Sequence, residues 1–184
     1  MVVTLLKHKF SASLVFGLFV LILVLWEYFH GGVTSHHLLA QKEMPAISNW
    51  WGLLSVPVLT WITLTRIEVR RKNSLLKAGE FSAQVIRGFF GGLIYGLSFA
   101  MLWEFGMADY MQYALILPLV LALFYPVYRM ECMLGFVLGL TYTFGGVLPL
   151  LIAPVLLLGG LIVFKGFRVI ASGLKKQFRS KKSS

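Results

Sequence analysis

Residues 88–103, GFFGGLIYGLSFAMLW, decide how this chain folds. Small residues recur at every fourth position of this apolar stretch, at Gly88, Gly92, Gly96 and Ala100. Positions four apart share one face of a helix, and small residues on that face let a second membrane helix approach closely. Gly135 and Gly139 repeat the spacing and predict a second packing ridge. The pattern therefore predicts membrane helices that pack tightly on their neighbours.

The composition of the whole chain extends this prediction to the other apolar runs. Of the 184 residues, 58% are hydrophobic and only 13% are charged, against about 25% charged in soluble domains. Apolar runs near the bilayer-spanning length of about 20 residues recur at 11–26, 50–64, 88–103 and 113–128, and twice within 133–165. The fold class predicted is all-α, a polytopic integral membrane helical bundle with about six transmembrane helices.

The charges of the chain predict its orientation in the membrane. The formal net charge is +10, and basic residues cluster at the ends of apolar runs, where they meet anionic headgroups. With both termini cytoplasmic, sixteen of the seventeen Lys and Arg residues fall inside and only Lys42 falls outside. We therefore expect an N-in/C-in protein of the bacterial inner (plasma) membrane. No soluble segment has a basic face interleaved with aromatic residues, so nucleic acid is not an expected partner.

The same charges divide the chain into parts. Residues 1–170 are predicted to be a single transmembrane helical domain, and residues 171–184 a polybasic cytoplasmic tail. The domain contains an outer polar loop at 30–49 and a basic cytoplasmic loop at 66–87, in which residues 74–86 suit a short interfacial helix. The start of the chain resembles a signal peptide. The aromatic belt at 26–29 instead favours an uncleaved first helix.

The residues most able to carry chemistry lie in the stretch 26–51, WEYFHGGVTSHHLLAQKEMPAISNWW. Glu27 and His30 are three residues apart and share a face if the helix continues. His36 and His37 follow a Gly-Gly turn, and adjacent side chains diverge, so one of the two is expected to join His30. Glu27, His30 and one of these histidines suit zinc or another divalent transition metal, with one position left for water.

Other polar residues near this end of the predicted helices supply candidates for general acid–base catalysis. These candidates are Glu27, Ser35, Glu104 and Asp109, with Glu43 as a further one. Glu104 is also an alternative metal ligand to Glu27. The competing interpretation is structural: acids and histidines at a membrane interface are often solvated, and Ser48 and Asn49 have the chemistry of helix caps.

Motifs that the chain lacks narrow the classes of function. The single cysteine, Cys132, excludes an internal disulfide and any CxxC motif. No predicted span carries a charged residue or histidine at mid-depth, which disfavours a proton-coupled transporter and a transmembrane haem protein. No G-x-S-x-G, P-loop, dinucleotide-binding or H-E-x-x-H motif is present.

Two classes of function remain. The leading hypothesis is a metal-dependent hydrolase or transferase that acts on a lipid or another amphiphile, because the histidine site lies at headgroup depth. The alternative is a non-enzymatic transporter, or a metal-binding or structural subunit of a membrane complex. The expected partners are the lipid bilayer, a lipid or amphiphilic substrate, and a membrane protein that packs on the glycine-rich helix faces.

Overall fold

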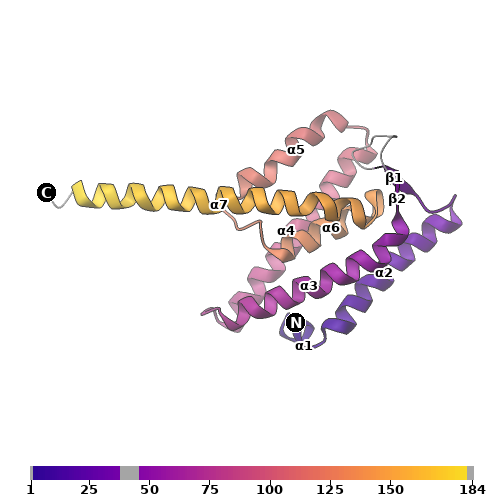
Figure 1. Cartoon of the computed structure of the whole chain (residues 1–184), viewed down its shortest axis with the longest axis horizontal. Coiled ribbons are helices and arrows are strands. Elements are labelled where there is room, and N and C mark those ends of the chain that lie inside the picture. The colour runs from indigo at the N-terminus through magenta and orange to yellow at the C-terminus, as the bar shows by residue number, and fades with distance from the viewer. Residues whose placement is uncertain (1, 38–45, 182–184) are drawn as a thin grey trace.

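The computed structural model describes residues 2–37 and 46–181, and these residues are mostly helical. The elements in chain order are α1 (Val2–Lys7), α2 (Lys9–Phe29), β1 (Ser35–His37), β2 (Ala46–Ser48), η2 (Asn49–Trp51), α3 (Gly52–Lys72), α4 (Ala78–Glu104), α5 (Ala108–Leu121), α6 (Met130–Phe144) and α7 (Val147–Lys181). Within these residues the only strands are the short pair β1 and β2. The predicted all-α helical bundle is confirmed, and Figure 1 shows its arrangement.

The predicted number of six full spans is wrong. Among the described residues, four helices are long and apolar enough to cross a membrane, at Lys9–Phe29, Asn49–Lys72, Ala78–Glu104 and Val147–Ser172. Helices α5 and α6 have only 14 and 15 residues, or about 21–23 Å at 1.5 Å per residue, against a hydrocarbon core of about 30 Å. The predicted fourth span fails because α5 ends at Leu121, three residues after the internal Pro118.

Helix α6 is the centre of the bundle, and the glycine ridges hold α4 against it. A Cβ added at Gly92 would overlap the carbonyl oxygen of Cys132, and one added at Gly135 would overlap that of Phe89. A Cβ at Gly96 would lie 2.5 Å from the Phe136 carbonyl oxygen. The two backbones therefore touch, and α6 is buried continuously from Met133 to Thr141. The glycine-rich faces thus pack on each other within this chain.

The two ends of the bundle differ in chemistry. We call one the basic end: there α2 and α4 begin, α3 ends, and Lys9, Arg70 and Glu131 lie in ion pairs. We call the other the histidine end: there α2 ends, β1 and β2 pair, and α6 turns into α7. At the basic end, α1 packs its apolar side on the bundle through Val2 and Leu6.

The predicted basic loop at 66–87 is mostly helix. Helix α3 continues to Lys72 and α4 begins at Ala78, so only 73–77 connect them. The short interfacial helix predicted at 74–86 is wrong as a separate element, because residues 78–86 form the first turns of α4. No proline interrupts 78–104, and Gly88 is accommodated because its missing side chain admits Glu131 of α6.

Helix α7 extends beyond the rest of the bundle, as Figure 1 shows. Its 35 residues correspond to about 52 Å at 1.5 Å per residue. The helix continues without a break through 171–181, so the predicted polybasic tail is not set off by a change in secondary structure. That the tail is a separate cytoplasmic part stays a prediction.

Candidate functional site

The histidine end is organised by the β1–β2 pair. The strands are antiparallel, with Ser35 opposite Ser48 and His37 opposite Ala46. The backbone N–H of Asn49 donates to the Thr34 carbonyl oxygen at 3.1 Å, just beyond the strand pair. These contacts bring the end of α2 beside the start of α3.

The Glu27 carboxylate accepts the hydrogen bonds that join the segments at this end of the bundle. It accepts from the Asn49 side-chain amide at 2.8 and 3.1 Å, and from the backbone N–H of Thr34 at 3.1 Å. Asn49 is only 5% exposed, so the amide and the carboxylate satisfy each other in a place that water barely reaches. Glu27 therefore connects α2 to the segment that leads into α3.

Asn49 also lies against the turn between α6 and α7. Gly145 has a φ of +69°, a backbone conformation that favours glycine, and a Cβ there would overlap the Asn49 side chain. Asn49 thus contacts the ends of three segments. Sequence reasoning identified it only as a helix cap. Ser48 provides the cap instead, accepting from the Trp50 N–H at 3.5 Å.

His30 is folded back on its own helix. Its Nδ1 lies 2.9 Å from the Trp26 carbonyl oxygen, and its ring stacks on the Trp26 indole with centroids 3.8 Å apart. A carbonyl only accepts, so Nδ1 carries the proton in this bond, and in a neutral imidazole Nε2 then keeps a lone pair. This is the tautomer in which a histidine ligates a metal through Nε2.

The remaining predicted site residues are spread over the histidine end. Ser35 is exposed on β1, Glu104 is exposed on the last turn of α4, and Asp109 is exposed on the first turn of α5. The backbone of His36 and His37 lies in β1. Glu43 lies outside the described residues. Among the side chains that the structure describes, no three His, Cys, Asp or Glu come together as a group able to hold a metal.

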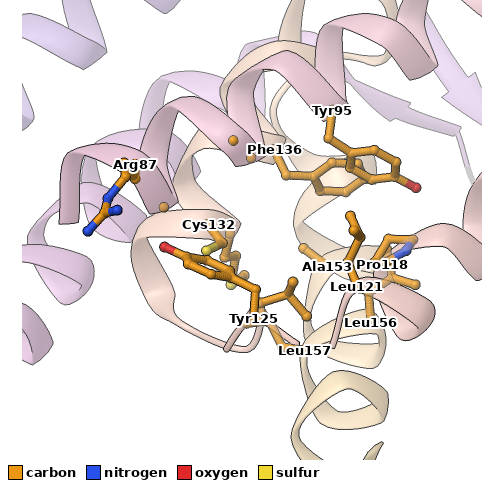
Figure 2. A pocket seen from close by; sticks show the side chains of 15 residues that line it. Arg87, Tyr95, Pro118, Leu121, Tyr125, Cys132, Phe136, Ala153, Leu156 and Leu157 are labelled. Atoms are coloured by element: carbon orange, nitrogen blue, oxygen red, sulfur yellow. The ribbon is translucent and has the colours of Figure 1, made fainter. Parts of the chain in front are cut away.

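A second candidate site, which the sequence analysis missed, is an apolar cavity inside the bundle. Its volume is about 230 Å³. The cavity is partly open and lies between α4, α5, α6, α7 and the segment 122–129, and Figure 2 shows the residues that line it. Its walls are almost wholly apolar and include Phe136, Leu156 and Leu157. Apolar pockets with few polar groups are the usual binding sites for apolar ligands.

One glycine that lies outside the packing ridge contributes to this cavity. Gly91 lies beside Gly92 but off the ridge, and a Cβ there would meet nothing within 4 Å. Gly91 lines the cavity, so the missing side chain leaves room between α4 and the helices opposite. In the sequence, the only sign of this cavity was the second glycine in the pair Gly91-Gly92, which the spacing of the packing ridge does not explain.

Few polar groups reach the cavity. The Tyr125 hydroxyl lies 3.5 Å from the Gln84 carbonyl oxygen, and burial raises the pKa of this phenol, which is therefore uncharged at neutral pH. The Cys132 thiol also faces this region. Figure 2 shows Arg87 at the edge, with its guanidinium directed away from the cavity. Its Nε donates to the Ala83 carbonyl oxygen at 3.3 Å.

Comparison with known proteins adds no assignment to these two sites. No family model matches the chain, and neither the curated proteins nor the solved structures contain a match. The candidate function therefore depends on the geometry of the residues themselves.

Proposed function

We propose that this chain is a non-enzymatic membrane protein that binds the hydrocarbon chain of a lipid or another amphiphile in the cavity between α4, α5, α6 and α7. The observation that carries the proposal is the cavity itself, about 230 Å³ in volume and walled by apolar side chains. A space of this kind excludes polar ligands, because they would lose their hydrogen bonds to water without replacement. A hydrocarbon chain makes no hydrogen bonds to water, so it loses none on entering the cavity.

The membrane setting supports the same ligand class. The four long apolar helices of the described residues fit a membrane protein, and bilayer lipid is the most abundant apolar ligand there. We place the protein in the bacterial plasma membrane with both termini in the cytoplasm, because that orientation puts the basic end on the side where Lys and Arg accumulate. The tail at 171–184 then lies on the same side.

Photocrosslinking to the cavity wall tests this proposal. Purified protein in detergent is irradiated with a long-chain fatty acid that carries a diazirine, and the labelled peptides are identified by mass spectrometry. We expect label on the α7 segment containing Leu156 and Leu157, which line the cavity. Gly91→Leu fills the space and should lower labelling about tenfold, since making room again costs about 1–3 kcal/mol.

Gly79→Leu is the matched control for this experiment. Gly79 lies on the same helix, its Cβ also meets nothing within 4 Å, and it does not line the cavity. Its labelling should equal that of wild type. Labelling of α7 that survives Gly91→Leu would mean that the probe binds the outer surface, and the proposed function would be wrong.

We propose as a second candidate a metal-assisted hydrolase or transferase at the histidine end, acting on a lipid or another amphiphile. The favouring observation is the bond between His30 Nδ1 and the Trp26 carbonyl oxygen, which leaves Nε2 of the neutral imidazole as the ligand atom. Zinc or another divalent transition metal would take His30 and either His36 or His37. Glu27 fits less well as a ligand, because both of its oxygens already accept hydrogen bonds.

In this second candidate, Ser35, Glu104 and Asp109 supply the acid–base groups. Metal content by mass spectrometry on purified, reloaded protein is the test. His30→Ala should lose the metal, and one of His36→Ala and His37→Ala should match it, while Asp109→Asn should keep it. Wild-type protein that holds no metal after reloading would eliminate this candidate.

A further inference from the structure

A cleft of about 760 Å³ opens at the basic end, at the opposite end of α2 and α3 from β1 and β2. One wall is the junction of α1 and α2, and the other is the part of α3 from Trp61 to Lys72. The basic residues that line it are Lys7, His8, Lys9, Arg71 and Lys72. This cleft shares no lining residue with the apolar cavity, and its chemistry is different.

Cations outnumber acids in this cleft. Among the described residues that line it, Glu68 is the only acid, and it is paired with Lys9 and, at 3.4 Å, with Lys72. Lys7 and Arg71 have no acidic partner among the described residues. The Arg71 Nη1 atom is moreover buried without a hydrogen-bond partner. Buried donors are normally satisfied, so this nitrogen is a donor that an anionic ligand in the cleft can satisfy.

The start of α2 adds further donors. Lys9, Phe10 and Ser11, its first residues, all line the cleft. The first N–H groups of a helix have no acceptor within the helix, and the residue at the cap, His8, makes no side-chain capping bond. Such N–H groups bind anions, and phosphate in particular. The helix start and the Arg71 guanidinium thus suit the same kind of ligand, an anion.

The cleft also has an apolar side. Trp61 and Phe10 line it and are 47% and 71% exposed. Trp61 lies near the middle of α3, about 16 Å along the helix axis from Lys72 at 1.5 Å per residue, so the apolar side of the cleft is nearer the centre of the helix than its basic side. An occupant with an anionic head and an apolar body matches both sides of the cleft.

We propose that this cleft is a binding site for the phosphate headgroup of an anionic phospholipid. The phosphate accepts from Arg71 and from the first N–H groups of α2, and Lys7 supplies additional positive charge. The glycerol and the start of the acyl chains lie on Trp61 and Phe10. The bound lipid ties the α1–α2 junction to the end of α3 and so stabilises the folded bundle.

Native mass spectrometry of the full-length protein tests this proposal. Protein in an uncharged detergent is titrated with phosphatidylglycerol or with phosphatidylcholine of the same acyl chains, and the singly bound complex is quantified. Wild type should retain phosphatidylglycerol in preference. Arg71→Gln should weaken its retention about fivefold or more, the effect expected for one cation at a lipid surface. Lys7→Gln should weaken it in the same direction.

Arg66→Gln is the matched control, because Arg66 lies on the same helix, is exposed and does not line the cleft. The control should retain phosphatidylglycerol like wild type. Equal weakening by Arg66→Gln and Arg71→Gln, or equal retention of both lipids by wild type, would show general charge attraction and overturn the proposal. Because the two sites share no residue, Gly91→Leu should leave this retention unchanged, so the two proposals fail separately.

Inorganic phosphate is the second ligand of the experiment and distinguishes the source of the anion. For a headgroup site, millimolar phosphate should compete weakly with phosphatidylglycerol and raise the melting temperature less than the lipid does. Phosphate that stabilises wild type but not Arg71→Gln, with no preference between the two lipids, would identify a site for a free anion. That outcome would overturn the lipid assignment.

Discussion

Arg70 and Glu131, sixty-one residues apart, form a two-pronged ion pair at the basic end of the bundle. The Arg70 Nη2 atom donates to Glu131 Oε1 at 2.7 Å and Nη1 donates to Oε2 at 3.1 Å. The guanidinium also lies over the Phe81 ring, 5.2 Å from its centre. Arg70 of α3 thus contacts both α6 and α4, the two helices that the glycine ridges bring together.

The two partners of this pair are exposed to different extents, and this predicts unequal effects of mutation. The Glu131 side chain is 2% exposed and that of Arg70 is 30% exposed. Arg70→Gln leaves a buried charge without compensation and should cost about 3 kcal/mol or more. Glu131→Gln leaves an arginine that reaches water and still has an acceptor, so it should cost about 1 kcal/mol. Unfolding in mixed detergent and SDS measures both.

Arg66→Gln serves as the control for the ion pair, because Arg66 is an exposed arginine of the same helix. It should change the free energy of unfolding by less than about 0.5 kcal/mol. Equal losses of stability from Arg70→Gln and Glu131→Gln would contradict this prediction, because only Arg70→Gln leaves an unpaired charge in the interior.

Adjacent glycines of α4 should respond oppositely to the same substitution. Gly92→Ala drives a methyl group into the Cys132 carbonyl oxygen and should cost about 1–3 kcal/mol as the helices separate. Gly91→Ala meets nothing within 4 Å and should cost nothing, since alanine is the better helix former. Melting temperature in detergent distinguishes them. Similar losses at both positions would mean that α4 does not pack on α6 along this ridge.

At the histidine end, two acids should differ in their importance for folding. Glu27→Gln replaces the charged acceptor of the Asn49 amide and the Thr34 N–H and should cost about 1.5–3 kcal/mol, the range for hydrogen bonds to a charged group. Glu104→Gln, at an exposed acid without a described partner, should stay within about 0.5 kcal/mol. Chemical unfolding of the two variants provides the comparison. An unchanged stability of Glu27→Gln would leave that carboxylate available for a catalytic role.

Topology reporters test the proposed orientation. Gly106 lies in the turn after α4, has a φ of +69° and faces open space, so an insertion there should be tolerated. A reporter inserted at Gly106 should be active outside the cytoplasm, and one fused after Ser184 should be active inside. Activity of both on one side would disprove the N-in/C-in arrangement and move the histidine end to the other face.

The long helices were predictable because their signals are local. The apolar run of α2, the aromatic residues at its end and the spacing of Gly88, Gly92 and Gly96 are all read within a few turns of one helix. Helix length was predicted less well. Pro118 marked the place where a span would fail, but whether a helix continues past a proline depends on its neighbours.

By itself the sequence determined the helical class, the separation of a basic end from a histidine end, and the close approach of glycine faces. Each of these follows from the chemistry of neighbouring residues. Only the tertiary structure decided that Arg70 pairs with Glu131, that the Asn49 side-chain amide donates to the Glu27 carboxylate, and that Gly91 lines a cavity. Those contacts join residues that are distant in the chain, and a residue's own pattern carries no information about which distant side chain will pack beside it.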